Sequence, residues 1–134
     1  MKIIKDFILI SIISIGFATA NYFINANRPN TELLPDEITL KSVNRLPTNL
    51  IIVDARSISD FNKGHIKNAV NLSEAKFDEQ LGAFLDIWTP ESTILVYCNS
   101  GSCNSSRNIA EKLKHECNIK NVYVLKDDWK KWKK

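Results

Sequence analysis

The stretch TILVYCNSGSCNSSRNIAEKL, residues 93–113, has the pattern of a strand, a tight loop and a helix. Thr93–Tyr97 is apolar at nearly every position, which is typical of a strand buried on both faces of a parallel sheet. Asn104–Glu116 has helical spacing, with one apolar face made by Ile109, Ala110 and Leu113. In sheets built from such units, ligands bind beyond the carboxyl ends of the strands. This pattern directs attention to Cys98, the residue that follows the strand.

Outward from this unit, short apolar runs alternate with helical segments. Leu50–Val53 (LIIV) and Val122–Leu125 (VYVL) predict further buried strands, and Ile38–Leu40 predicts a short edge strand. Helices are expected at residues 57–62 and 74–85, and Trp129 and Trp132 are expected to pack a C-terminal helix. The alternation predicts the α/β class, with a largely parallel sheet flanked by helices.

Length and composition exclude several classes of protein. The chain has 134 residues, of which 44% are hydrophobic and 25% charged, so one compact domain is expected rather than a disordered chain. The net charge of +3 is spread along the chain instead of forming a basic stripe, which disfavours binding to nucleic acid. We expect a monomer.

The first part of the chain differs in composition from the rest. Residues 7–24 carry no charge and would span about 27 Å as a helix, and Lys2 and Lys5 precede them. This pattern predicts a single-pass anchor in the inner (cytoplasmic) membrane, with the following domain on the periplasmic side. The alternative is a signal peptide cleaved after Ala18-Thr19-Ala20, which would secrete the domain to the periplasm. We therefore assign residues 1–24 to an anchor or signal sequence, 25–35 to a linker and 36–134 to the folded domain.

Cys98 has the surroundings of a reactive thiol. A loop curled at the start of a helix directs backbone N–H groups inward, and the helix dipole adds positive charge there. Such a cradle would lower the pKa of the Cys98 thiol, and the thiolate is the nucleophilic form. The residues expected to form the cradle are Asn99, Ser100, Gly101, Ser102, Cys103 and Asn104.

Three stretches together resemble a single-domain rhodanese. They are VDARSISDFNKGHIKNAVNL at residues 53–72, VYCNSGSCNSSRNIAEKL at 96–113 and NVYVLKDDWKKW at 121–132. The resemblance implies a parallel five-stranded sheet and a sulfurtransferase that carries sulfane sulfur as a persulfide on Cys98. The six-residue loop Cys98–Cys103 resembles the sulfur-transferring branch of the family rather than the phosphatase branch, whose loop is one residue longer.

The resemblance also implies roles for residues outside the loop and for the partners. Asp54 and Arg56 are expected to brace the site, and His65 is expected to support the fold near it. The implied partners are a small sulfur donor and a thiol or protein acceptor. No cofactor is implied, and no spacing of His and Cys residues predicts a metal site.

Two departures from the family pattern concern charge. The loop residues Asn99, Ser100 and Ser102 are neutral, where the family commonly has Arg or Lys. Asp127-Asp128 stands where a Gly-Gly pair usually precedes the C-terminal aromatic residue. Both departures lead us to expect that thiosulfate is a poor donor.

The role of Cys103 stays open at the level of the sequence. It is a resolving thiol that attacks the Cys98 persulfide, one half of a redox dithiol without sulfur transfer, or a bystander at the start of the helix. Three functions compete accordingly: a sulfurtransferase, a thiol-disulfide redox protein using Cys98 and Cys103, and a non-catalytic interaction or sensor module. Cys117 is expected to be a lone structural thiol.

Overall fold

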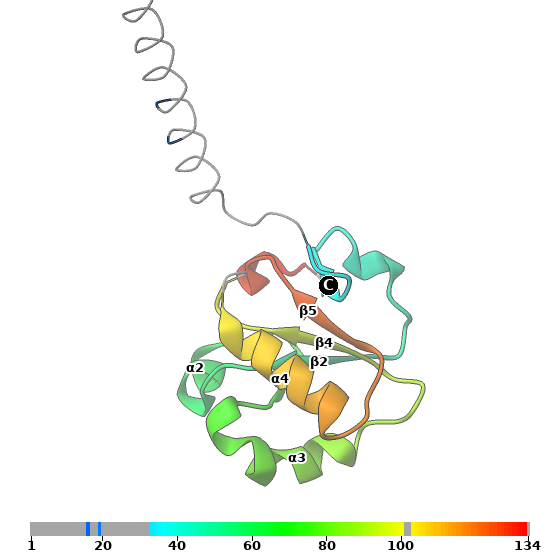
Figure 1. Cartoon of the computed structure of the whole chain (residues 1–134). Coiled ribbons are helices and arrows are strands. Elements are labelled where there is room, and N and C mark those ends of the chain that lie inside the picture. Colours follow the sequence, from blue (N-terminus) through cyan, green and yellow to red (C-terminus); the bar gives the residue numbers. More distant parts are fainter. Residues whose placement is uncertain (1–15, 17–18, 20–32, 101–102, 134) are drawn as a thin grey trace, which may run out of the picture. The chain divides into compact units, whose positions relative to one another are not determined.

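A computed structural model describes residues 16, 19, 33–100 and 103–133 (Figure 1). The chain divides into two units, Met1–Leu33 and Leu34–Lys134, and the whole sheet belongs to the second. The predicted anchor or signal at residues 1–24 lies outside the described residues except at 16 and 19, and most of the predicted linker also lies outside them. Within the described ranges, no helix combines the length and apolar character that a membrane crossing requires.

The second unit is built on a five-stranded sheet in which every pair of neighbouring strands is parallel. The strand order is β1-β5-β4-β2-β3, which confirms the α/β class and the five-stranded parallel sheet. The strands are β1 (Glu37–Ile38), β2 (Leu50–Asp54), β3 (Val70–Asn71), β4 (Thr93–Tyr97) and β5 (Val122–Leu125).

The helices connect these strands, and some differ from the sequence-based expectation. They are α2 (Ile58–Lys63), α3 (Phe77–Leu85) and α4 (Asn104–His115), with 3-10 turns η1 (Val43–Arg45), η2 (Glu74–Lys76) and η3 (Trp129–Lys131). The helix expected over 74–85 is therefore a 3-10 turn followed by an α-helix. The C-terminal helix expected around Trp129 is only the turn η3, which the Asp128 side chain caps by accepting the Lys130 N–H.

Both faces of the sheet are covered, which explains why β4 is apolar at nearly every position. Ile94 and Val96 belong to the core cluster that includes Phe84 of α3 and Leu113 of α4, and Figure 1 shows α4 lying across the strands on that face. Leu95 and Tyr97 point to the opposite face. Their cluster contains Val43, Ile66 and Leu125, with the half-buried Trp129 and Trp132 packed against it.

Charged groups join the edge strand β1 to α4. Arg107 of α4 donates to Asp36 at 2.7 Å and to Glu37 at 2.6 Å, and Lys114 also bonds Asp36. Burial alone would raise the pKa of Asp36, but the hydrogen bonds from Arg107 and Lys114 outweigh it and hold that pKa below its usual value. The pKa of Glu37 is lowered in the same way, against burial, by the backbone N–H of Leu34 and by Arg107 and Lys126.

We predict that Arg107→Met destabilises the domain at pH 7 by about 1 to 3 kcal/mol, because two half-buried carboxylates lose a charged donor. Carboxylates with lowered pKa stabilise the fold above their unfolded pKa of about 4, and this stabilisation is lost as the pH falls through the folded value. The difference in unfolding free energy between wild type and variant should therefore shrink below about pH 4. Urea unfolding of the full chain at several pH values measures it.

The matched control is Lys76→Met, which removes an exposed pair with Glu79. Exposed pairs of this kind contribute about 0 to 1 kcal/mol. Equal losses of stability in the two variants would contradict the role given to Arg107.

Candidate active site

A buried carboxylate lies where β2 ends. Asp54 is 0% exposed, and its two oxygens accept hydrogen bonds from Nε of Arg56 at 2.9 and 3.1 Å and from Nη2 at 2.6 Å. The Tyr97 hydroxyl, at the end of β4, donates to Asp54 Oδ2 at 2.6 Å. A charge this deep is tolerated only when it is paired and hydrogen-bonded, and here both conditions are met.

Arg56 extends this network to two further elements. Its Nη2 donates to the carbonyl of Gly64, which ends α2, at 2.7 Å, and its guanidinium carbon lies 4.4 Å from the centre of the Trp129 ring. Gly64 has φ 156°, a conformation that L side chains rarely adopt. The hydrogen bond with Asp54 raises the pKa of Arg56, so the guanidinium stays charged.

Tyr97 joins the network as both donor and acceptor. Its hydroxyl accepts the backbone N–H of Ile66 at 3.1 Å while donating to Asp54. Burial, followed by the hydrogen bond with Asp54, raises the pKa of Tyr97 above its usual range. Tyr97 therefore stays protonated and keeps donating at any physiological pH.

Two amide side chains that sequence reasoning missed complete the bracing of this region. Asn71 Nδ2 donates to the backbone carbonyls of Asp54 at 3.0 Å and Arg56 at 2.8 Å. Gln80 Nε2 in turn donates to Asn71 Oδ1 at 2.8 Å. The only signal in the sequence was Asn71 itself, a polar residue between apolar neighbours in a very short strand.

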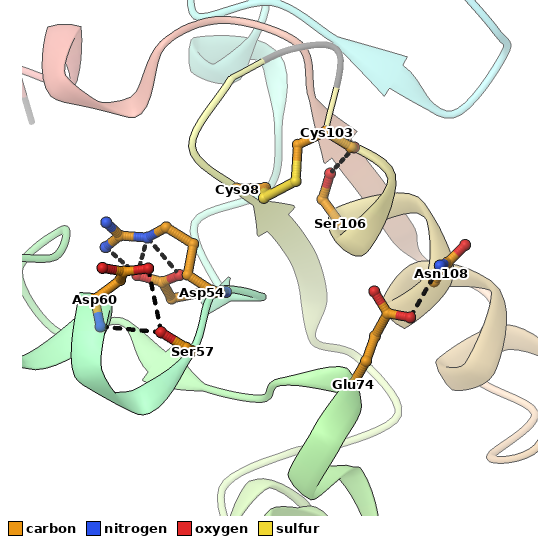
Figure 2. Close-up of a disulfide and its surroundings, with 9 residues drawn as sticks. Asp54, Ser57, Asp60, Glu74, Cys98, Cys103, Ser106 and Asn108 are labelled. Atoms are coloured by element: carbon orange, nitrogen blue, oxygen red, sulfur yellow. Dashed lines mark hydrogen bonds and ion pairs between the residues drawn. A yellow bond between two sulfur atoms is a disulfide. The ribbon is translucent and has the colours of Figure 1, made fainter.

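Cys98 and Cys103 form a disulfide at the carboxyl end of β4 (Figure 2). Their Cα atoms are 6.1 Å apart, within the range that a disulfide spans. Cys98 is 5% exposed, whereas Cys103 is half-buried at the N-cap of α4. In this state neither sulfur titrates, and two-electron reduction has to precede any attack by a Cys98 thiolate.

The predicted cradle is described only in part. Asn99, Ser100 and Asn104 are exposed, while Gly101 and Ser102 lie outside the described residues. The Cys103 N–H donates to the Ser100 carbonyl at 3.0 Å. Among the described residues, no group of three or more His, Cys, Asp or Glu side chains is arranged to hold a metal ion.

His65 lies at the end of α2. It is exposed, its Nδ1 donates to the Phe61 carbonyl at 2.9 Å, and its ring stacks on the Phe61 ring with centres 3.8 Å apart. These contacts are local to α2.

Asp127 and Asp128, which stand in place of the usual Gly-Gly pair, accept hydrogen bonds from backbone N–H groups. Asp127 Oδ2 accepts the N–H of Leu40 at 2.6 Å, and Asp128 Oδ1 accepts the N–H of Lys130 at 3.0 Å. Both carboxylates therefore have structural partners on the segments around β1 and η3.

Comparisons with known proteins agree with this architecture. The profile of the family described as "Rhodanese-like domain" matches residues 39–134. Thiosulfate sulfurtransferase GlpE of Coxiella burnetii is 33% identical over 85 residues, which cover 63% of this chain and 73% of that protein.

Two solved structures illustrate the likeness of fold. Protein BH2092 of Bacillus halodurans has a TM-score of 0.57 at 20% identity, covering 87% of this chain and 80% of that chain. A structure of EanB that carries a cysteine persulfide, with ergothioneine, has a TM-score of 0.55 at 27% identity and covers 67% of this chain and 24% of that one.

We predict that Tyr97→Phe costs about 1 to 3 kcal/mol of unfolding free energy, because the N–H of Ile66 then loses its buried acceptor. Tyr123→Phe is the matched control, since this half-buried tyrosine lies on the neighbouring strand and no hydrogen bond to its hydroxyl is described. Thermal or urea unfolding gives the comparison. A loss in Tyr97→Phe no larger than that in Tyr123→Phe would contradict the bracing role.

Proposed function

The chain belongs to the rhodanese-like domain family, and on that premise we propose that it is a sulfurtransferase that moves sulfane sulfur through a persulfide on Cys98. The observation that carries the proposal is the position of this cysteine. It follows the central strand β4, next to the N-terminus of α4 and directly after the braced Tyr97. GlpE of Coxiella burnetii, the similar protein reported above, is named a thiosulfate sulfurtransferase, which supports the same class of reaction.

The first half-reaction is a displacement at sulfur. The reduced Cys98 thiolate attacks the outer sulfur of the donor, and the donor's own bond to that sulfur breaks with its electron pair leaving on the rest of the donor. Cys98 then carries the sulfur as a persulfide. A covalent intermediate of this kind divides one transfer into two easier displacements. EanB, of which 24% of the chain matches this fold, is described as carrying a cysteine persulfide, which supports an intermediate of this kind here.

We propose that Cys103 resolves the persulfide when no external acceptor is present. Its thiolate attacks Sγ of the Cys98 persulfide, the bond to the outer sulfur breaks, and hydrosulfide leaves. The product is the Cys98–Cys103 disulfide, whose presence in the structure supports this step. A reductant of the dithiol class would then return both thiols to the reduced state.

The same disulfide favours a second candidate function. Cys98 and Cys103 would act as a thiol-disulfide couple that exchanges electrons with other dithiols and transfers no sulfur. The two candidates use the same sulfur atoms, so they differ only in whether Cys98 gains a sulfur atom.

Intact-protein mass spectrometry separates the candidates. The protein is reduced, freed of reductant and incubated with thiosulfate or a polysulfide. We expect a gain of one sulfur in the Cys103→Ala variant, where the persulfide persists, and no gain in Cys98→Ala. In wild type the sulfur should be transient and give way to a mass two hydrogens lower than the reduced form.

Cys117→Ala is the matched control, because Cys117 is the free cysteine of the described residues and is half-buried. It should behave as wild type. Loss of two hydrogens in wild type without any sulfur gain in Cys103→Ala would favour the redox couple. Sulfur gain that survives Cys98→Ala would overturn the proposed nucleophile.

We also propose that residues 7–24 anchor the protein in the inner membrane with the rhodanese-like domain on the periplasmic side. The absence of charge over these residues, and the lysines that precede them, support the proposal. Export would place the two cysteines in a compartment where disulfides persist.

The expected result is that the mature protein has the mass of the full chain and sediments with membranes. Mass spectrometry of the purified protein and fractionation of cells measure the two properties. A soluble protein that lacks residues 1–20 would replace the anchor with a cleaved signal peptide.

A further inference from the structure

A cavity of about 270 Å³ lies between the segment that follows β1 and the end of η3. Its apolar lining is made by Leu40, by Val43 of η1 and by Trp132, which follows η3. All three belong to the cluster on the sheet face opposite α4 or pack against it. No described residue of the loop after β4 lines this cavity, so it is separate from the candidate active site.

Three lysines surround this apolar lining. Lys41 follows the segment after β1, Lys131 ends η3, and Lys133 lies two residues further on. All three side chains are exposed. Within residues 33–100 and 103–133, no carboxylate lies within ion-pair distance of any of them. The cavity therefore combines an apolar interior with three cations that no described carboxylate neutralises.

Two carboxylates lie near this cavity without lining it. Asp127 Oδ2 accepts the N–H of Leu40, and Asp128 Oδ1 accepts the N–H of Lys130. Lys130 adds its own charge to η3, so four lysines on this side of the domain face two carboxylates. The balance of charge favours an anionic ligand.

The size of the cavity indicates that it takes only part of a ligand. Pockets that enclose a whole small molecule have volumes of about 300 to 1,000 Å³. This cavity is smaller, and its lysines are exposed. It suits a charged head group whose apolar remainder stays outside the protein.

The side chains present are those that proteins place at a membrane surface. Indole rings lie at the level of the lipid head groups, where their apolar body and polar N–H are both accommodated. Lysine side chains cover apolar surface with their methylene groups while their ammonium groups reach polar surroundings. Trp132 is half-buried and Lys131 and Lys133 flank it, so one short segment presents both features.

We propose that this face of the domain docks on an anionic phospholipid bilayer, with one lipid head group in the cavity and the three lysines on the lipid phosphates. The inference rests on the membrane anchor proposed above. Residues 25–33 would then join the anchor to the described domain, and nine residues span at most about 30 Å. A domain held that close to a bilayer docks on it through contacts that are individually weak.

The test uses the full chain in lipid nanodiscs and follows tryptophan fluorescence. The discs contain phosphatidylcholine alone or mixed with phosphatidylglycerol, and both kinds include a lipid with a nitroxide quencher on its head group. We expect stronger quenching in the anionic discs. Trp132→Phe should remove this additional quenching. Trp88→Phe is the matched control and should keep it, because Trp88 lines a different cavity.

Charge is tested with a second pair of variants. Each lysine near an anionic surface strengthens docking roughly fivefold, so Lys131→Glu should weaken it by at least about that factor. Lys120→Glu is the matched control, since Lys120 is exposed and precedes β5, whereas η3 follows that strand. Added salt should lower the quenching of wild type toward its value in neutral discs. Quenching that is independent of phosphatidylglycerol, or equal effects of the two substitutions, contradicts the inference.

A further arm distinguishes a bilayer from a free anion. Soluble glycerophosphoglycerol, the head group without its chains, is added to the protein in neutral discs. We expect no change in the fluorescence due to Trp132. A change that saturates with this compound, and that Lys131→Glu weakens, would assign the cavity to a soluble anion and overturn lipid docking.

Failure of the anchor and failure of docking give different results. If the chain stays in both kinds of disc but its quenching does not depend on anionic lipid, the docking inference fails alone. If the chain does not stay in neutral discs, the anchor proposal fails. The soluble chain is then mixed with anionic discs, where quenching that requires Trp132 and Lys131 keeps the docking inference and its absence overturns it.

Discussion

The ionised carboxylate of Asp54, completely buried at the end of β2, is the constraint on which the surrounding structure depends. Burying such a charge costs several kcal/mol unless its hydrogen bonds are satisfied. Arg56 and Tyr97 satisfy these hydrogen bonds, and Tyr97 does so from the neighbouring strand. Arg56 also contacts the carbonyl of Gly64 and the ring of Trp129, so the network joins the ends of two strands, the end of α2 and the turn η3.

This network holds the residue that precedes Cys98, the proposed nucleophile. Tyr97 is locked by hydrogen bonds to Asp54 and Ile66, and Cys98 is the next residue. The backbone is therefore held where the loop begins, while the sulfur stays free to bond to Cys103, as in the structure, or to a donor's sulfur after reduction. Sulfur transfer and disulfide exchange need the same rigid support, so the fold alone is compatible with either chemistry.

Periodicity located the long elements well. Thr93–Tyr97 was expected as a buried strand and is one, and the helix expected over 104–116 spans Asn104–His115. The two-residue strand β3 was not predicted from the pattern, because two residues are too few to show a period. Tyr97 was counted only as an apolar strand residue, since nothing local indicates that its hydroxyl meets a carboxylate 43 positions earlier.

The electrostatics of the site show most clearly where local sequence is insufficient. The neutral loop and the pair Asp127-Asp128 suggested a mouth that repels anions. Folding engages both aspartates with backbone N–H groups. It also brings Lys63, with its ion-pair partner Asp60, and Lys130 to one cavity beside Asn99. The net charge near a reactive group depends on which charged side chains are already engaged in hydrogen bonds or ion pairs. In this domain those partners come from turns and helix ends.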